Sequence, residues 1–183
     1  KVLDPHAVGR EVAMICFENV SFQYESERHP ALREFTHSIA KGELVLLLGP
    51  SGCGKTTITR LLNGLVPHFY EGELKGIVRI GGRTTTETTI QSLADIVGSV
   101  FQDPRSQFFA TDVTSEIAFS CENAGLPRNE IHRRVENASR KLGIESLLGR
   151  SIFALSSGEK QAVAVASVYA FAQSVIFMDV ASA

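Results

Sequence analysis

The sequence predicts an α/β fold with a mostly parallel core sheet, an N-terminal antiparallel β portion and an inserted α-helical lobe. A continuous apolar run, typical of a parallel strand buried on both faces, occurs at 44–48, and buried strands are also predicted at 96–101 and 175–178. Predicted helices accompany these strands at 54–65, 129–142 and 157–172. Strands that alternate with helices in this way are expected to form one sheet with helices on its faces.

Length and composition are those of a single globular domain. The chain has 183 residues, of which 44% are hydrophobic, so a sizeable apolar core is expected. The net charge of −2 does not indicate binding to nucleic acid or to an anionic membrane surface, so any anion site must be local. We expect one domain over 1–183, with a β portion and core (13–101), a helical lobe (102–151) and a closing helix and strand (152–183).

The first part of the chain is predicted to form antiparallel strands. Apolar residues alternate in patches over Ala13–Tyr24, and 31–39 is expected to return as a second strand after a polar turn. A further strand pair is expected around 77–80, with a turn at Gly81 and Gly82.

The pattern becomes helical between 102 and 151. Thr111 or Asp112 can cap a helix that continues to about Glu122. The segment 129–142 carries an apolar stripe and ends at Gly143. These helices predict a lobe inserted between two strands of the parallel sheet.

The uncharged stretch 161–178 approaches the length of a membrane span. It contains polar residues, and its composition changes from Ala-rich to β-branched and aromatic after Gln173. We therefore predict a buried helix followed by a buried strand. The sequence has no apolar leader in 1–10, and its three cysteines are widely separated, which favours a reducing compartment.

Residues 49–56, GPSGCGKT, match G-x-x-x-x-G-K-[ST] between a predicted strand and a predicted helix. Glycines allow successive backbone N–H groups to turn inward, and the helix N-terminus adds partial positive charge. Lys55 is expected to reach the β- and γ-phosphates of a nucleotide, and the Thr56 hydroxyl is expected to bind Mg²⁺. The motif therefore predicts a P-loop NTPase, with a plain glycine-rich turn as the alternative.

Two further motifs depend on the P-loop for their interpretation. Asp179 follows the apolar run at 175–178, where a second Mg²⁺ ligand is expected, although such an Asp is also common in turns. Residues 155–159, LSSGE, form a capping box that opens the Ala-rich helix. The same helix N-terminus is also a possible site for a phosphate brought by another chain.

The order of these features resembles that of ABC transporter ATPase domains. The P-loop is followed by Gln102 after a buried strand, then by 155–159, then by Asp179 after another strand. This resemblance covers roughly Cys16 to the end of the chain. Within the family, VFQDP at 100–104, SQFF at 106–109 and LSSGEKQ at 155–161 are similar to the ATPases of energy-coupling-factor importers, which take up vitamins and metal ions.

The resemblance implies that the chain binds ATP with Mg²⁺, and that Lys55 and Gln102 are catalytic. Mg²⁺ would be bound by Thr56, Gln102 and Asp179. Tyr24 would stack on adenine, although a core position beside Phe22 is equally compatible with the pattern. The nucleotide-binding residues implied are Tyr24, Gly49, Pro50, Ser51, Gly52, Cys53, Gly54, Lys55, Thr56, Thr57, Ser156, Ser157, Gly158 and Glu159.

The resemblance also implies partners. Ser156 and Gly158 would touch the γ-phosphate bound to a second ATPase subunit, in a homodimer or a heterodimer. The helical lobe, including Phe108 and Phe109, would dock on transmembrane transporter components, although adjacent phenylalanines are also typical of a core. No nucleic-acid partner is expected. The implied location is peripheral, on the cytoplasmic face of the cell membrane, with the isolated chain soluble.

The sequence departs from the family after Asp179. Val180 and Ala181 stand where Glu and Pro are usual, and losing a positioned base costs about 10²- to 10⁴-fold in rate. The chain ends at Ala183, just after the Walker B strand, so we expect a C-terminally incomplete domain whose five histidines include no switch histidine. Two alternatives stay open: a non-catalytic nucleotide-binding subunit with a degenerate site, and a soluble P-loop phosphotransferase. The sequence does not indicate the transported substrate.

Overall fold

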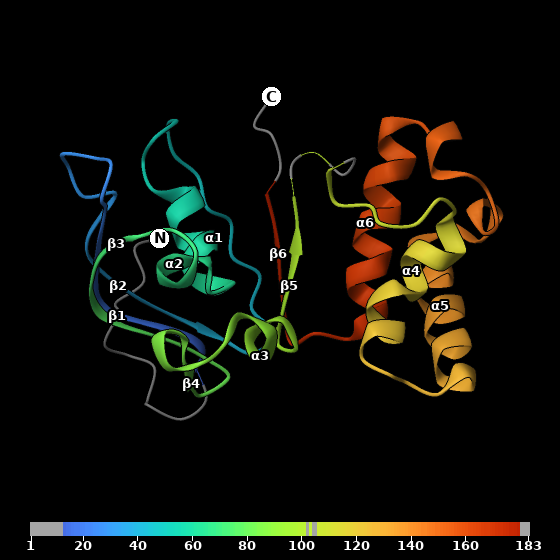
Figure 1. The fold of residues 1–183 in the computed structure, drawn as a ribbon, viewed down its shortest axis with the longest axis horizontal. Helices are drawn as coiled ribbons and strands as arrows, with labels where there is room; N and C mark the ends of the chain where they lie inside the picture. The colour runs from blue at the N-terminus through green and yellow to red at the C-terminus, as the bar shows by residue number, and fades with distance from the viewer. Residues whose placement is uncertain (1–12, 102, 104–105, 180–183) are drawn as a thin grey trace. The chain divides into compact units, whose positions relative to one another are not determined.

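The computed structural model of the chain describes residues 13–101, 103 and 106–179 (Figure 1). The chain divides into two compact units, Lys1–Val97 and Gly98–Ala183. Each unit has its own architecture. As the sequence predicts, the fold is α/β, with an antiparallel N-terminal sheet, a parallel sheet and helices.

The first unit contains a four-stranded antiparallel sheet in the order β2-β1-β3-β4. Its strands are β1 (Ala13–Tyr24), β2 (Leu32–Ala40), β3 (Gly72–Ile80) and β4 (Arg83–Thr84). Phe17, Val20 and Phe22 of β1 are fully buried. The pairing of Phe22 with Leu32 and of Tyr24 with Gly72 places the end of β1 between its two neighbours. The predicted antiparallel portion is therefore confirmed.

Short helices complete the first unit: α1 (Lys55–Leu62), α2 (Leu65–His68) and α3 (Ile90–Ala94). The predicted helix at 54–65 is correct at its start but ends three residues early. Asn63 is the C-cap, and Gly64 has a φ of 75°, a left-handed conformation that ends an α-helix. The helix therefore stops before Pro67.

The prediction of a buried strand at 44–48 is wrong. This segment has no strand structure, and Leu44, Leu46 and Leu48 are 97%, 77% and 80% exposed. A strand forms only where a neighbour takes up its backbone hydrogen bonds, and none of the described strands pairs with this segment. An apolar run indicates a tendency to be buried but does not supply the pairing strand.

The second sheet consists of β5 (Val97–Val100), where the chain passes from the first unit to the second, and β6 (Val175–Met178). The backbone N–H of Asp179 donates to the carbonyl of Val100 at 2.9 Å. The carboxyl ends of both strands therefore meet, which confirms the predicted parallel pairing. Val100 packs against Ala164 and Val168, so a helix covers one face of this pair.

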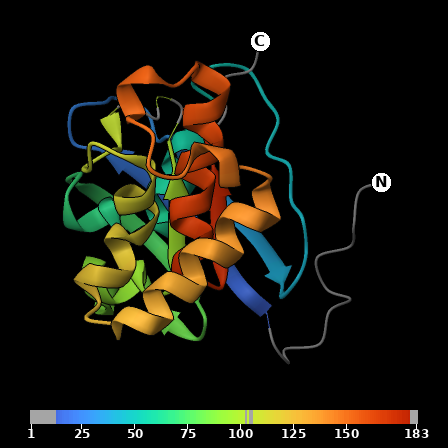
Figure 2. The same ribbon diagram turned by 90° about the vertical axis from the view of Figure 1, so that its right-hand side faces the viewer.

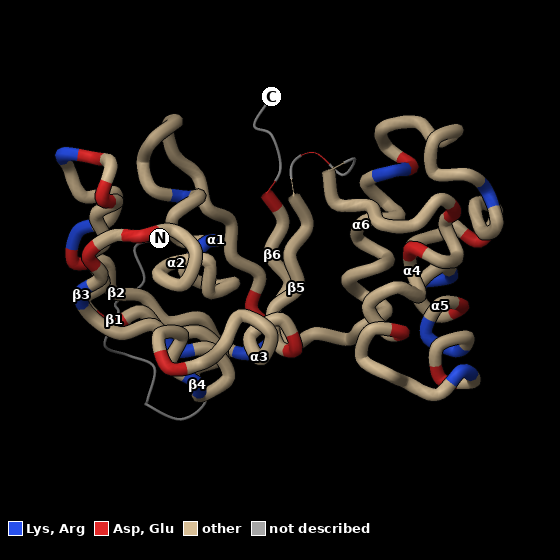
Figure 3. The backbone as a smooth tube through the Cα atoms, in the orientation of Figure 1, with Lys and Arg blue, Asp and Glu red and all other residues tan. Residues whose placement is uncertain are grey.

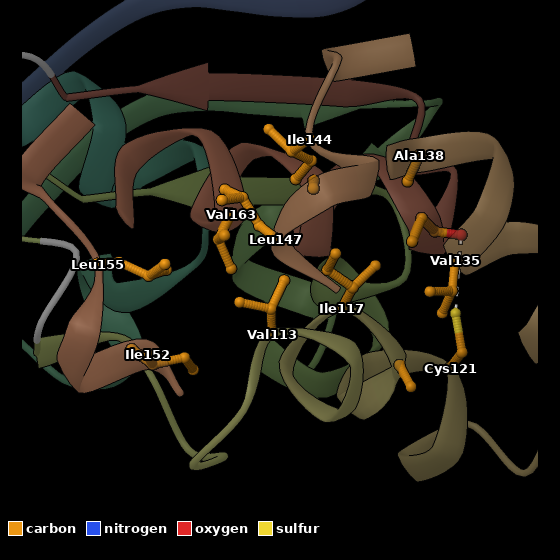
Figure 4. Packing of buried hydrophobic residues seen from close by; sticks show 13 residues of the cluster. Val113, Ile117, Cys121, Val135, Ala138, Ile144, Leu147, Ile152, Leu155 and Val163 are labelled. Carbon is orange, nitrogen blue, oxygen red and sulfur yellow. Dashed lines mark hydrogen bonds between the residues drawn. The ribbon is translucent and has the colours of Figure 1, made fainter. Parts of the chain in front are cut away.

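Three helices form the main core of the second unit: α4 (Val113–Asn123), α5 (Arg128–Leu142) and α6 (Ser157–Phe171) (Figures 1 and 2). Their buried side chains, including Val113, Ile117, Val135 and Val163, interdigitate with Ile144, Leu147, Ile152 and Leu155 from the connections (Figure 4). Asp112 caps α4 and Gly143 ends α5, as predicted. The division between a lobe at 102–151 and a segment at 152–183 stays a prediction.

The uncharged stretch at 161–178 forms the rest of α6 and β6, so the predicted helix and strand are found. The prediction that the strand is buried is wrong, because Ile176 and Met178 are 40% and 45% exposed and β5 is the only described strand that pairs with β6. Figure 3 shows charged residues along α5, whereas α6 is charged only in its first turn, at Glu159 and Lys160. Residues of α6 such as Val163 and Ala166 are completely buried. Within the described chain, no helix has both the length and the apolarity needed to cross a membrane.

Candidate functional site

The loop that precedes α1 is shaped by its glycines. Gly52 and Gly54 have φ values of 79° and 95°, which side chains rarely adopt. A Cβ atom at Gly54 would also lie 2.6 Å from the carbonyl oxygen of Ala31 and 2.9 Å from Leu32 Cδ2. Glycine at this position therefore lets the start of α1 lie against the start of β2.

Lys55 is held by the loop that it follows. Its Nζ donates to the carbonyl oxygens of Gly49 at 2.8 Å and Pro50 at 2.9 Å, and lies 3.6 Å from Cys53 Sγ. The side chain thus folds back over the loop, and its ammonium group is next to the backbone of 49–53. A cation at a helix N-terminus favours the approach of an anionic ligand.

The two threonines after Lys55 point to different surroundings. Thr56 is exposed in the first turn of α1. Thr57 is 4% exposed, and its Oγ1 lies 3.1 Å from the hydroxyl of Tyr24. The buried threonine therefore ties the first turn of α1 to the end of β1.

Two residues that the sequence did not single out surround Tyr24. Arg60 Nη1 donates to the Tyr24 hydroxyl at 3.0 Å, and the Arg60 guanidinium lies 3.9 Å from the ring centroid of Tyr70. Spacing offers one signal for Arg60, because residues three apart share a helix face and Arg60 follows Thr57 by three. No comparable signal identifies Tyr70.

A shallow depression of about 520 Å³ lies beside Tyr24. It is lined by Gln23, Tyr24, Glu25, Gly72 and Glu73. Tyr24 is partly buried and packs perpendicular to Phe22, with ring centroids 4.8 Å apart. The core position and the surface role considered for Tyr24 are therefore compatible.

In the second unit, Ser156 and Glu159 form the predicted capping box at the start of α6. Ser156 Oγ accepts from the Glu159 N–H at 3.3 Å, and the Glu159 carboxylate accepts from the Ser156 N–H at 2.7 Å. Hydrogen bonds from the Ser156 backbone and hydroxyl, with a smaller contribution from Arg150, lower the pKa of Glu159. The carboxylate thus stays ionised at the N-terminus of this helix.

Gly158 has no packing reason to be glycine within its own chain. Ser156, Ser157 and Gly158 are all exposed, and a Cβ atom on Gly158 would meet nothing within 4 Å. Its φ is not positive. The described surroundings of Gly158 therefore do not require the absence of a side chain there.

Asp179 follows β6 directly and is partly buried, with its backbone N–H fixed by Val100. Gln102, Val180 and Ala181 lie outside the described residues. Of the adjacent phenylalanines, Phe108 packs against the core, whereas Phe109 is 75% exposed and stacks on Phe119 at 4.8 Å. The core interpretation is therefore correct for Phe108, whereas docking of Phe109 on a membrane partner stays a prediction.

Tyr24 and the residues at 49–57 therefore lie together in the first unit, whereas 156–159 and Asp179 belong to the second. The arrangement in the first unit provides a glycine-shaped loop, a lysine and a helix N-terminus beside an aromatic ring. This combination can bind a phosphate chain attached to a planar group.

Comparison with protein families gives a match to the family described as ABC transporter, over residues 32–183. A putative ABC transporter ATP-binding protein from Treponema denticola is 51% identical over 166 residues, which cover 91% of this chain and 34% of that protein. Another from Methanosarcina mazei is 41% identical over 167 residues, covering 91% of this chain and 28% of that protein.

Among solved structures, cbiO1 from Clostridium perfringens, part of the ABC transporter complex cbiONQ, is similar. Its TM-score is 0.81 at 30% identity, and the match covers 92% of this chain and 65% of that one. The chain spans about a third of the length of this Treponema denticola protein and of a second relative from the same organism.

Proposed function

Because the chain belongs to the ABC transporter family, as an ATP-binding domain, we propose that it binds Mg²⁺-ATP at 49–57 and that the longer protein hydrolyses ATP to drive import. The observation that carries this proposal is the position of Lys55. Its ammonium lies next to the carbonyl oxygens of Gly49 and Pro50, in the loop before α1 where Gly52 and Gly54 have positive φ.

The phosphates of ATP are expected to take over the Lys55 ammonium from the carbonyls of Gly49 and Pro50. The present bonds join the ammonium to neutral carbonyl oxygens, whereas a bond to phosphate joins opposite charges, so Coulomb attraction favours the exchange. The backbone N–H groups at the start of α1 add further donors. The loop therefore binds the phosphate chain electrostatically, and other residues bind the adenine base.

We propose Thr56 and Asp179 as Mg²⁺ ligands on the chemistry of their side chains. The exposed hydroxyl of Thr56 and the carboxylate of Asp179 are oxygen ligands, and Mg²⁺ needs few of them because it retains water and phosphate oxygens. Gln102 is proposed as a third ligand and as a contact to the attacking water. When bound, Mg²⁺ neutralises charge on the phosphates.

Ser156, Ser157 and Gly158 are proposed to contact the γ-phosphate bound to a second ATPase subunit. All three are exposed at the N-terminus of α6, and no described residue explains a glycine at 158. A helix N-terminus favours a phosphate, and a residue without Cβ allows its close approach. Glu159 contributes by holding the first turn through its bonds to Ser156. The working assembly is therefore a dimer.

We further propose that the transporter is of the energy-coupling-factor type, with transmembrane components docked on the helical lobe, including the exposed Phe109 in the connection before α4. The motifs at 100–109 and the similarity to cbiO1, part of the complex cbiONQ, support this assignment. The protein would act at the cytoplasmic face of the cell membrane, as a peripheral subunit. The soluble phosphotransferase alternative is not proposed, because the family match includes 155–159.

The test is calorimetric binding of Mg²⁺-ATP to the chain, to Lys55→Ala and to Lys141→Ala, an exposed lysine on α5. Loss of Lys55 is expected to weaken binding about 10- to 100-fold, since a hydrogen bond to a charged group contributes about 1.5–3 kcal/mol. Lys141→Ala should match the wild type. The proposal fails if the wild type does not bind ATP, or if Lys55→Ala binds as tightly as the wild type. Sizing with and without ATP tests the dimer.

One sequence observation favours a second candidate, a non-catalytic subunit that uses ATP to hold a dimer together. Val180 stands where the family carries the glutamate that polarises water. Val180→Glu in the longer protein discriminates the two candidates. If hydrolysis by the homodimer stays at background after this change, the non-catalytic subunit is favoured.

A further inference from the structure

Arg60 lies against two tyrosines of the first unit. Its guanidinium is 3.9 Å from the ring centroid of Tyr70 and 5.6 Å from that of Tyr24. Its Nη1 also donates to the Tyr24 hydroxyl at 3.0 Å. Arginine is suited to this position, because its planar group stacks on a ring while its edge donates hydrogen bonds.

The contacts of Tyr24 fix the orientation of its ring. The hydroxyl is bound by Arg60 and by Thr57 Oγ1 at 3.1 Å. Around the ring, Phe22 is perpendicular at 4.8 Å and Tyr70 is perpendicular at 6.2 Å. Phe22 is completely buried, so one side of Tyr24 is held by the core. The ring is thus anchored at its hydroxyl end and flanked by two other rings.

This anchored ring lies close to the proposed phosphate site. Thr57 directly follows Thr56, the proposed Mg²⁺ ligand, and Arg60 is one turn further along α1. Tyr24 also lines the shallow depression described above. The helix that begins at the P-loop therefore also carries the groups that hold the aromatic ring in place.

We propose that Arg60 is a positioning residue that, supported by Tyr70, fixes the Tyr24 ring for stacking on the nucleobase; this rests on the ATP binding proposed above. Arg60 acts through the Tyr24 hydroxyl. Stacking depends on the ring being held in one orientation before the base arrives, because ordering it on binding costs affinity. The phosphate contacts of 49–56 do not depend on Arg60.

The test compares the affinity for ATP with the affinity for inorganic tripolyphosphate, which lacks a base. Arg60→Met keeps the apolar stem and removes the guanidinium. It is expected to weaken ATP binding roughly 2- to 10-fold, as for the loss of one hydrogen bond, and to leave tripolyphosphate binding unchanged. Tyr24→Phe, which keeps the ring, should reproduce both results.

The double variant decides whether Arg60 acts through Tyr24. If it does, Arg60→Met adds nothing once Tyr24→Phe is present, so the two effects are not additive. Arg79→Met is the matched control, because Arg79 pairs with Glu18 on the same sheet at 2.6 Å. It should bind both ligands like the wild type. Arg60→Lys, a milder change, should restore part of the affinity for ATP.

Three results would overturn the inference: equal loss of ATP and tripolyphosphate binding in Arg60→Met, additive effects in the double variant, or no effect of Arg60→Met on ATP. The first would mean that Arg60 only supports the fold of α1. A wild-type chain that binds neither ligand would contradict the proposed ATP site and this inference with it. Equal affinity of the wild type for tripolyphosphate and ATP would retain the phosphate site but reject base stacking, and with it the role inferred for Arg60.

Discussion

The carboxylate of Glu116 accepts the backbone N–H of Phe109 at 2.9 Å. The same oxygen accepts the N–H of Ala110 at 2.8 Å, and Glu116 itself is only 3% exposed. A buried acid on α4 therefore supplies the acceptor for two backbone donors in the segment that carries the exposed Phe109. The ring of Phe109 is further held by its stack on Phe119.

Replacing Glu116 by alanine is expected to destabilise the chain by about 2–4 kcal/mol, since two part-buried backbone donors lose their charged acceptor and each such hydrogen bond contributes about 1–2 kcal/mol. Glu116→Gln keeps one acceptor oxygen and should lose less. Denaturant unfolding measures both changes. Glu122→Ala, at an exposed position of the same helix, is the control and should lie within about 0.5 kcal/mol of the wild type. If Glu116→Ala and Glu122→Ala unfolded at the same denaturant concentration, Glu116 would not stabilise the chain as an acceptor.

Glu130 predicts a pH dependence of stability. Hydrogen bonds from Arg133 and Arg134 lower the pKa of Glu130 to about 2, from an ordinary value of 4.5. As the pH falls, Glu130 is protonated in the unfolded chain before it is protonated in the folded chain. The stabilisation by the ionised carboxylate is therefore complete above pH 4.5 and is lost as the pH falls toward 2. The difference in thermal midpoint between the wild type and Glu130→Gln should therefore be present at pH 6 and shrink over this range.

The matched control for Glu130 is Glu136→Gln, at an exposed position of α5 where the described structure contains no ion pair. The difference in thermal midpoint between Glu136→Gln and the wild type should change little between pH 6 and pH 3. A difference for Glu130→Gln that grows as the pH falls would reverse the sign of the predicted linkage and reject the ion pairs as its cause.

Local signals predicted most of the secondary structure correctly. The cap at Asp112, the glycine at 143 and the capping box at Ser156 depend on residues within a few positions, and all three are found where expected. The β6 bounds, Val175–Met178, agree with the predicted strand. These features follow from short-range hydrogen bonds, which the sequence specifies directly.

Features that depend on a distant partner were not predictable in the same way. The leucines at 44–48 are apolar enough for a buried strand, yet pairing is a property of the neighbouring strand, and the segment is exposed. The contact between Arg60 and Tyr70 likewise depends on how α1 and the residues after α2 pack. The spacing of apolar residues does not predict that the Arg60 guanidinium stacks on the Tyr70 ring.

Gly158→Asp is predicted to separate monomer stability from dimer formation. A carboxylate in the first turn of α6 should raise or preserve stability, since a negative charge near a helix N-terminus contributes about 0.3–1 kcal/mol, and no described atom lies within 4 Å of the new Cβ. The same carboxylate would face the γ-phosphate bound to the second subunit, so ATP-driven dimerisation should be lost. Asn129→Asp, in the first turn of α5, adds the same charge where no phosphate is proposed and should dimerise normally. Sedimentation with Mg²⁺-ATP measures the dimer, and normal dimerisation of a stably folded Gly158→Asp chain would show that 156–158 do not contact the partner's nucleotide.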